Sequence, residues 1–251
     1  MNFKGRTAIV TGAGSARGIG RETALMLAGF GANVVVADMD LAGAEERVKE
    51  IQALGVKGLA VKTDITDEAS VDNLVKKAIG EFGRIDILVN NAGITQPIKT
   101  VDMTLADFNR IINVNLVGTF LVTKAVVKEM IKAKYGRIVS LSSVSGKRGG
   151  GVYGGSHYSA AKAGILGFSK ALAREVVEYG ITVNSICPGA VDTEIRKGTT
   201  EEFEKALRES VPMKRLATIR EIAFSICFLA AEDAGYITGE DIDINGGTHM
   251  D

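Results

Sequence analysis

The sequence predicts an α/β protein built as one domain around a doubly wound, parallel sheet of seven strands. Segments with strand and helix character alternate along the whole chain. The strand segments are continuously apolar rather than alternating, which is typical of strands covered on both faces. The 251 residues, of which 46% are apolar, suffice for one large core, and no linker, repeat or low-complexity segment divides residues 1–251.

The first half of the chain alternates four strands with three helices. The first apolar run ends before Gly12, and the Val-rich second run ends at Asp38. The helix that follows is amphipathic and ends at Gly55, a suitable C-cap, and the next helix has Thr66 or Asp67 as its candidate N-cap. We expect strands at residues 7–10, 34–37, 57–62 and 85–89, and helices at residues 18–31, 41–54 and 67–82.

Long helices dominate the second half. We expect helices at residues 104–134, 157–179, 201–209 and 219–231, and strands at residues 136–142, 181–186 and 241–244. Residues 104–134 are expected to form one continuous helix. Ligands on such sheets bind at the carboxyl ends of the strands, so functional residues should follow the strands directly.

Composition excludes several classes of protein. The 30 Lys and Arg residues balance the 30 Asp and Glu residues, so no net charge attracts nucleic acid or an anionic membrane. Cys187 and Cys227 lie in apolar segments without metal-type spacing, and we expect buried, reduced thiols and no metal site. No N-terminal signal peptide is apparent, and no continuous apolar run reaches the roughly 18 residues of a membrane span. A cytoplasmic protein is expected.

A glycine-rich segment joins the first strand to the first helix. Residues 11–20 read Thr-Gly-Ala-Gly-Ser-Ala-Arg-Gly-Ile-Gly. Glycines in such a turn let backbone N–H groups and the helix dipole meet a diphosphate. A plain glycine-rich turn is the alternative, but the acidic residue after the second strand favours dinucleotide binding.

Asp38 bears on the choice of dinucleotide. Its carboxylate can accept hydrogen bonds from both ribose hydroxyls of NAD. A 2′-phosphate about 4 Å away would be repelled by about 4 kcal/mol at an effective dielectric of about 20. Arg17 argues the other way, because it could meet a 2′-phosphate, although it could equally pair with Asp38 or face solvent. We expect NAD, with NADP as the less favoured cofactor.

Two further strands are followed by candidate cofactor contacts. Asp64 could accept the adenine amino group while Ile65 packs on the ring, or Asp64 could be a turn or cap residue. Asn91, Ala92 and Gly93 follow the fourth strand and permit close approach to a ribose, with a tight turn as the alternative.

Tyr158 and Lys162 stand four residues apart on a predicted helix and therefore share one face. An ammonium beside a phenol favours the phenolate, and lowering a Tyr pKa from about 10 to about 7 requires about 4 kcal/mol. Lys162 together with an oxidised nicotinamide could supply this. Tyr158 is then a candidate acid or base near neutral pH. A surface helix pair is the alternative, since this spacing also arises by chance.

In order, these motifs resemble those of the short-chain dehydrogenase/reductases over essentially the whole chain. The matching elements are the glycine loop, Asn90-Asn91-Ala92-Gly93, Asn115, Ser143, Tyr158 with Lys162, and Pro188-Gly189. Each motif is modestly specific alone, and the set placed after the right strands is highly specific. The resemblance implies a single-domain Rossmann fold and an NAD(P)-dependent oxidoreductase.

The resemblance also implies the roles of the catalytic residues. Ser143 matches the hydroxyl donor to the substrate oxygen, and Ser142 is the weaker candidate. Tyr158 matches the acid/base. Lys162 matches the residue that lowers the Tyr pKa and binds the nicotinamide ribose.

The remaining matches concern a proton relay and the cofactor. Asn115 matches the helix Asn that holds a relay water, with Asn113 as the alternative, and Thr193 matches the contact to the carboxamide. The full expected cofactor set is Gly12, Ser15, Arg17, Gly18, Ile19, Asp38, Asp64, Ile65, Asn91, Ala92, Gly93, Tyr158, Lys162, Pro188, Gly189, Val191 and Thr193. The glycine loop and the stretch 149–155 are both longer than the family pattern.

The implied reaction is hydride transfer between nicotinamide C4 and the carbon of a secondary alcohol or ketone. Arg148 follows Ser143 closely, His157 precedes Tyr158, and residues 194–215, the expected substrate lid, are rich in charge. Ser143, Arg148, His157 and Tyr158 are the expected substrate contacts. These features favour NAD-linked oxidation of a small polar alcohol, namely a polyol, sugar, hydroxy acid or anionic hydroxy compound. Solvated charges, and a His157 that only caps or packs, are the alternatives.

Two other functions are alternatives to oxidation of a small polar alcohol. One is an NADPH-dependent 3-oxoacyl-[acyl-carrier-protein] reductase, which much of the chain resembles but which Asp38 opposes. The other is a non-catalytic nicotinamide-binding regulator, which the intact Tyr158 and Lys162 oppose.

The resemblance implies a homotetramer, with a dimer as the alternative. The long helices starting near Thr104 and His157 are the expected interface. Small residues on the second helix allow a partner helix to approach, or else pack on the chain's own sheet: Ala160, Ala161, Ala163, Gly164 and Gly167.

Overall fold

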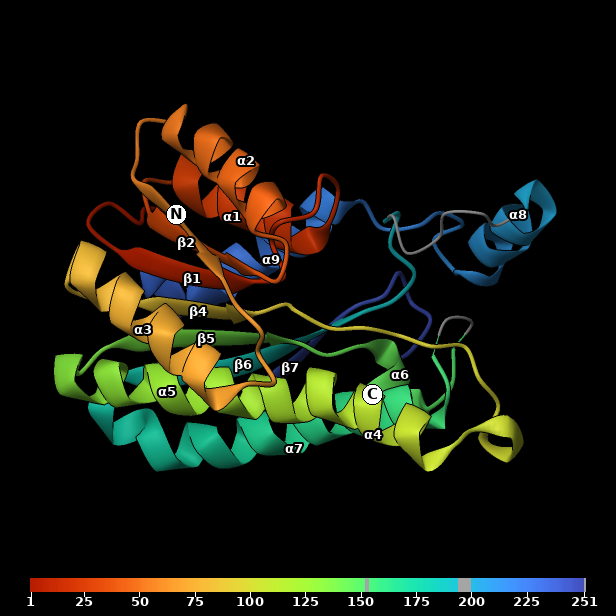
Figure 1. Cartoon of the computed structure of the whole chain (residues 1–251). Coiled ribbons are helices and arrows are strands. Elements are labelled where there is room, and N and C mark those ends of the chain that lie inside the picture. The colour runs from red at the N-terminus through yellow and green to blue at the C-terminus, as the bar shows by residue number, and fades with distance from the viewer. Residues whose placement is uncertain (152–153, 194–199, 251) are drawn as a thin grey trace.

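The computed structural model, which describes residues 1–151, 154–193 and 200–250, shows a parallel sheet between two layers of helices (Figure 1). The strands are β1 (Thr7–Thr11), β2 (Asn33–Asp38), β3 (Gly58–Lys62), β4 (Ile87–Asn90), β5 (Gly136–Leu141), β6 (Ile181–Pro188) and β7 (Asp241–Ile244). Their order is β3-β2-β1-β4-β5-β6-β7, and every pairing is parallel. The predicted doubly wound Rossmann-type domain is confirmed.

Helices cover both faces of the sheet, as the continuously apolar strands require. They are α1 (Ile19–Gly29), α2 (Leu41–Gln52), α3 (Glu68–Phe82), α4 (Leu105–Ile112), α5 (Gly118–Ala133), α6 (Val144–Arg148), α7 (Ser156–Val176), α8 (Glu201–Ser210) and α9 (Ile219–Ala230). One apolar cluster packs α1, α2 and α9 on the sheet, and a second packs α3, α5 and α7 on the opposite face.

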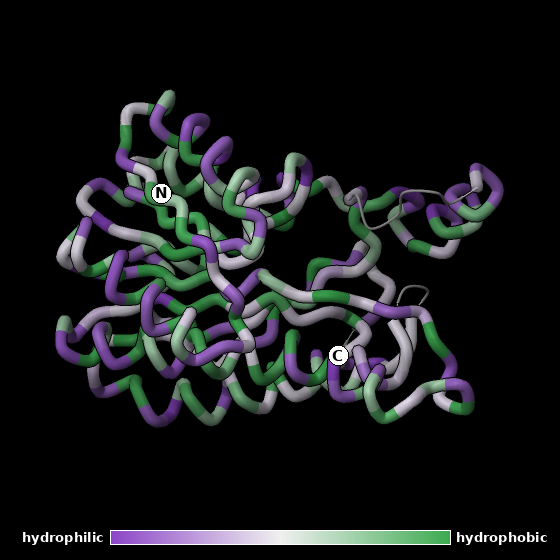
Figure 2. Tube along the Cα trace, viewed as in Figure 1, coloured by the Kyte–Doolittle hydropathy of each residue, from purple (hydrophilic) through white to green (hydrophobic). Residues whose placement is uncertain are grey.

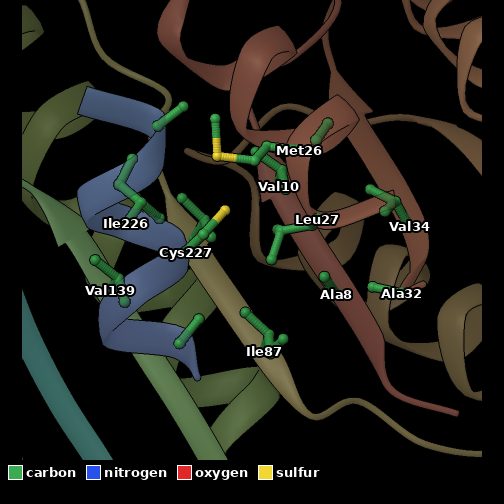
Figure 3. Packing of buried hydrophobic residues seen from close by; sticks show 14 of the residues in the cluster. Ala8, Val10, Met26, Leu27, Ala32, Val34, Ile87, Val139, Ile226 and Cys227 are labelled. Atoms are coloured by element: carbon green, nitrogen blue, oxygen red, sulfur yellow. The ribbon is translucent and has the colours of Figure 1, made fainter. Parts of the chain in front are cut away.

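Apolar residues are concentrated along the strands, whereas the helices alternate apolar and hydrophilic residues (Figure 2). Figure 3 shows Cys227 of α9 turned toward Leu27 and Val10, whereas Ile226 lies on the other side of the same helix. All four side chains are fully buried. At about 1.5–3 kcal/mol for each large buried side chain, this cluster fixes α1 and the glycine loop before it.

The register brings the carboxyl ends of the central strands to one edge. Thr11 pairs with Ala37 across β1 and β2, and Asn90 pairs with Ser140 across β4 and β5. The chain crosses back between β1 and β4, which are neighbours although β2 and β3 separate them in sequence. This reversal is the switch point at which doubly wound sheets bind ligands.

The predicted continuous helix over residues 104–134 is interrupted. A π-helical turn at Asn113–Val117 separates α4 from α5. The Asn115 amide donates to the carbonyl of Ile111 at 3.0 Å, so a side chain replaces the backbone partner that the wider turn withdraws. Among the described residues, the segment Leu105–Ala133 is the one helix long and apolar enough to cross a membrane, and 44% of its most apolar window is buried inside the protein.

Three smaller differences concern boundaries. The short helix α6 was not expected, and it forms because Ser143 caps its first turn. The predicted helix 157–179 begins at Ser156 and ends in a 3₁₀ turn at Val177–Tyr179. Of the expected lid, residues 194–199 lie outside the described residues, and 201–210 form α8, which Figure 1 shows standing away from the sheet.

Candidate active site

The glycine loop is built so that backbone lies close to backbone. Gly12 has a φ of +65°, and a Cβ there would lie 2.7 Å from the Cα of Ala92. A Cβ on Gly20 would lie 2.6 Å from the Gly12 carbonyl oxygen. Gly18, the N-cap of α1, offers no side chain to the first helical turn, so its N–H groups are available to an outside acceptor. This cradle fits a dinucleotide diphosphate.

The loop after β4 is joined to the glycine loop by hydrogen bonds. The Asn91 amide donates to the carbonyls of Thr11 and Gly12 at 2.8 and 2.9 Å, and the Ala92 N–H donates to the Thr11 hydroxyl at 3.1 Å. Asn91 therefore holds the floor of the crevice together. Gly93 is exposed, as a close approach by a ribose requires.

Asp38 closes β2 beside the same loop. One carboxylate oxygen accepts the Gly14 N–H at 2.8 Å, and the other accepts the Asp40 N–H at 3.0 Å. The side chain is half-buried, so Asp38 both orders the glycine loop and keeps a negative charge at the position expected for the adenosine ribose.

Arg17 does not pair with Asp38, and its exposed side chain has a partner from the other half of the sheet. Its guanidinium pairs with Asp192, in the loop after β6, at 2.5 Å. Ser15 and Ile19, its neighbours in the loop, are exposed and half-buried respectively.

The two residues expected beside the adenine have local structural partners. One carboxylate oxygen of Asp64 accepts both the N–H and the hydroxyl of Thr66, which lowers the pKa of the carboxyl and makes it a turn residue. Ile65 is buried, and a Cβ on Gly118 of α5 would lie 2.7 Å from its Cδ1. Most of the Ile65 side chain therefore serves the core rather than an open ring-binding surface.

Ser143, Tyr158 and Lys162 meet at the end of β5. Ser143 is the N-cap of α6, and its hydroxyl accepts the Ser145 N–H at 3.1 Å. Burial raises the pKa of Tyr158, and the neighbouring Ser143 side chain lowers it by a smaller amount. The net pKa of Tyr158 is raised, because desolvation of the phenolate dominates. The predicted lowering depends on Lys162 acting together with an oxidised nicotinamide, and it stays a prediction.

Lys162 is 3% exposed, and its ammonium donates to the Leu141 carbonyl at 2.6 Å. The nitrogen lies 5.6 Å from the centre of the Tyr158 ring. Burial lowers the pKa of Lys162 from 10.5 to about 8. The shared face predicted from the four-residue spacing is present, but the first partner of the ammonium is the backbone of β5.

Ser142, the weaker candidate for the hydroxyl donor, has a structural partner. Its hydroxyl donates to the carbonyl oxygen of Lys162 at 2.8 Å and is buried. Gly146, which sequence reasoning missed, brings α6 against α7, since a Cβ there would lie 2.7 Å from the Lys162 carbonyl carbon. The only indication of this contact in the sequence is that a glycine stands three residues after Ser143.

Asn115 and Asn113, the two candidates for the relay residue, differ in burial. Asn115 is fully buried, its amide donates to the Ile94 carbonyl at 2.9 Å, and its oxygen accepts the Ile94 N–H at 3.3 Å. A Cβ on Gly93 would lie 3.6 Å from the Lys162 nitrogen and closer still to the Asn115 oxygen, so these three positions converge. Asn113 is exposed.

The segment after β6 completes the crevice. Pro188 is the last residue of β6, and the Gly189 N–H donates to the Ile244 carbonyl at 3.0 Å. Val191 is buried and forms a parallel bridge with Ala217. The Thr193 N–H donates to the Val191 carbonyl at 3.0 Å. The contact between Arg17 and Asp192 brings this turn against the glycine loop.

Two expected substrate contacts, and the neighbouring Lys147, have other partners. The Arg148 guanidinium donates to the Thr248 carbonyl at 3.2 Å. The Lys147 ammonium pairs with Asp243 at 2.8 Å. His157 is fully buried, and its Nδ1 accepts the N–H of Tyr158 at 2.9 Å, so it caps the first turn of α7. The lysine and the arginine are drawn to β7 and the C-terminal turn, which the sequence alone did not place nearby.

A glycine cradle at the switch point of a doubly wound sheet, with a Tyr beside a buried Lys, is typical of one class of protein, the oxidoreductases that use a nicotinamide dinucleotide. A family model described as "Enoyl-(Acyl carrier protein) reductase" matches residues 12–249. The chain belongs to the short-chain dehydrogenase/reductase family.

Similar curated proteins span its whole length. The 3-oxoacyl-[acyl-carrier-protein] reductase FabG of Escherichia coli is 43% identical over 250 residues, covering 100% of both chains. The 3-oxoacyl-[acyl-carrier-protein] reductase of Synechocystis is 42% identical, covering 98% of this chain and 97% of its own. An uncharacterized short-chain type dehydrogenase/reductase of Sinorhizobium fredii is 40% identical, covering 98% of both.

These relatives correct one prediction and confirm another. The chain is an NAD(P)-dependent oxidoreductase, as predicted. The predicted NAD-linked oxidation of a small polar alcohol is wrong, because full-length relatives at 42–43% identity carry the name of the alternative, a 3-oxoacyl-[acyl-carrier-protein] reductase. Arg148, one of the residues that favoured a polar substrate, donates to the Thr248 carbonyl instead.

Proposed function

We propose that this protein reduces the 3-oxo group of an acyl thioester carried on acyl carrier protein to a 3-hydroxy group. The observation that carries the proposal is the full-length, 43% identity to a reductase of that name, together with the Ser143, Tyr158 and Lys162 cluster. Bound NAD(P)H supplies the hydride, which reaches C3 of the acyl group.

The proposed roles of the side chains are those that the family resemblance implies. Ser143 donates a hydrogen bond to the C3 carbonyl oxygen, and Tyr158 delivers its proton to the same oxygen. A raised Tyr158 pKa keeps the hydroxyl protonated at neutral pH, which is the state that reduction consumes. Lys162 holds the crevice side of α7 to β5 and places a positive charge beside the developing phenolate.

We further propose that NADH is preferred over NADPH. Asp38 keeps a carboxylate at the end of β2, where a 2′-phosphate would be repelled. The basic side chains that could offset this charge have other partners: Arg17 pairs with Asp192, and Arg47 pairs with Glu50 at 3.0 Å and donates to the Ser15 carbonyl. The name shared by the relatives leaves the cofactor open.

A homotetramer is the proposed assembly. One exposed apolar surface lies on α4 and α5, where Leu105 is 75% and Phe120 is 42% exposed. A second lies on α9 in the opposite helix layer, where Phe224 is 54% exposed. A closed tetramer with perpendicular two-fold axes requires at least two separate contact surfaces on each chain, and these two apolar surfaces could supply them. Of the small residues on α7, Ala161 is buried within its own chain, whereas Ala160 and Ala163 are exposed.

The test is reduction of a 3-oxobutanoyl thioester of acyl carrier protein, followed by loss of NADH or NADPH absorbance. Turnover should be faster with NADH and should fall by at least 10³-fold in Tyr158→Phe, which removes the proton donor. The matched enoyl thioester is the comparison substrate. Turnover of the enoyl thioester alone, or equal turnover in Tyr158→Phe, would overturn the proposal.

A further inference from the structure

One ion pair connects two loops from different halves of the sheet. Arg17 lies in the glycine loop after β1, and Asp192 lies in the loop after β6. The guanidinium nitrogen is 2.5 Å from the Asp192 carboxylate and 3.4 Å from the Asp192 carbonyl oxygen. The two residues are 175 positions apart in sequence, so the contact is made only by the fold.

The pair spans the carboxyl edge of the sheet. Strands β4 and β5 stand between β1 and β6, and three strand spacings of about 4.8 Å amount to about 14 Å. The ends of β4 and β5, which carry Asn91 and Ser143, therefore lie between the two loops.

Both loops are anchored. The Asp192 N–H donates to the Ala217 carbonyl at 3.0 Å, next to the Val191 bridge. On the other side, the Asp38 carboxylate holds the Gly14 N–H at 2.8 Å. The ion pair thus connects two fixed points and is not a contact between two free side chains.

We propose that Arg17 and Asp192 form a clasp over the cofactor crevice that slows release of the bound dinucleotide. The inference rests on the cofactor class that the family shares and not on the acyl substrate. The clasp also engages the basic side chain of the glycine loop, and so withholds it from a 2′-phosphate.

The expected effect is modest because the pair is accessible to water. The side chains are 52% and 53% exposed, so solvent and salt screen the attraction. Exposed pairs of this kind contribute little, and removing either charge should speed NADH release by about two- to fivefold.

The experiment measures NADH release by stopped-flow fluorescence, with excess NAD⁺ as the displacing ligand. Arg17→Gln and Asp192→Asn should each speed release, and the double variant Arg17→Asp with Asp192→Arg should restore a rate nearer the original. Lys132→Gln breaks a comparable exposed pair with Glu129, at 2.6 Å on α5, and should leave the rate unchanged.

Three results would overturn the clasp. Release rates could be unchanged in both single variants, or the exchanged pair could be no slower than the singles. Arg17→Gln could also weaken the binding of NADPH while leaving the binding and release of NADH unchanged, which would show that Arg17 binds the 2′-phosphate. If thermal melting shows that the variants do not fold, NADH release is measured on the unaltered chain at increasing salt. The release rate should rise between about 0.05 and 1 M KCl, because salt weakens the ion pair. A rate that does not depend on salt would contradict the proposal.

Discussion

The ammonium of Lys162 donates to the carbonyl oxygen of Leu141 at 2.6 Å, which joins the middle of α7 to the end of β5. The residue after Leu141, Ser142, returns the connection by donating to the Lys162 carbonyl at 2.8 Å. These reciprocal bonds fix the height of Tyr158 relative to Ser143, which follows directly in sequence. The cost is a buried charge, and burial lowers the pKa of Lys162 to about 8.

Lys162→Met should therefore abolish catalysis while stabilising the fold. A pKa lowered from 10.5 to about 8 corresponds to an unfavourable free energy of about 3 kcal/mol for holding the protonated form at pH 7. The unfolded chain binds the proton more tightly, so the penalty is full below pH 8 and vanishes as the pH rises toward 10.5. Urea denaturation at pH 7 and pH 10 should show the gain of the variant shrinking at the higher pH.

Lys124→Met is the matched control, since Lys124 is exposed and pairs with Glu68. It should change the free energy of unfolding by less than about 0.5 kcal/mol at either pH. A loss of stability in Lys162→Met at pH 7 would show that the bond to Leu141 outweighs desolvation.

Much of the fold was predictable because continuous apolar runs separated by amphipathic helices leave few arrangements other than a doubly wound sheet. The glycine loop, Asn91 and the Ser143, Tyr158 and Lys162 set were found by their places after strands. The π-helical turn was not, because an Asn in an apolar helix carries no signal that its amide will bond to Ile111.

The partners of charged side chains were the least predictable part of the site. Lys147 and Arg148 follow Ser143 in sequence, but their side chains pair with Asp243 and the Thr248 carbonyl, 96 and 100 positions away. Arg17 similarly pairs with Asp192. Long-range ion pairs leave no local pattern, so the sequence could not separate a substrate contact from a structural one.

Asn115 should contribute strongly to the stability of the fold. Asn115→Ala removes two bonds to Ile94 and one to Ile111, and leaves buried backbone groups without partners. We expect a loss of about 2–4 kcal/mol in the free energy of unfolding. Asn113→Ala, in the same turn but exposed, should stay within about 0.5 kcal/mol. Equal effects of the two substitutions in chemical denaturation would contradict this assignment.

Gly146 should tolerate no side chain. In Gly146→Ala the new Cβ would lie 2.7 Å from the Lys162 carbonyl carbon and 2.8 Å from the Ala163 nitrogen, so α6 must move off α7. Because Ser143 caps α6, its hydroxyl would move away from Tyr158, and we expect kcat to fall by about 10²-fold. The control is Gly80→Ala on α3, where the new Cβ would have no atom of another element within 4 Å. This substitution should raise the free energy of unfolding by about 0.5–1 kcal/mol and leave kcat unchanged. A normal kcat in Gly146→Ala would show that the position of Ser143 does not depend on the contact between α6 and α7.

Asp38 should set the choice between the two dinucleotides. Asp38→Asn keeps an oxygen that can accept the Gly14 N–H but removes the charge, so the loop can stay ordered while repulsion of a 2′-phosphate is lost. The repulsion between unit charges about 4 Å apart, about 4 kcal/mol at an effective dielectric of about 20, sets an upper bound of roughly three orders of magnitude.

We expect the ratio of kcat/KM for NADPH to that for NADH to rise by about 10²-fold in Asp38→Asn, since water and salt screen part of that repulsion. Asp40→Asn is the control. It removes a charge two positions away, from an exposed side chain that caps α2 through the Gly43 N–H at 3.1 Å. Because Asp40 is not placed to meet a ribose, its substitution should change the ratio by less than tenfold. An unchanged ratio in Asp38→Asn, with a melting temperature close to that of the original chain, would mean that another group excludes the phosphate.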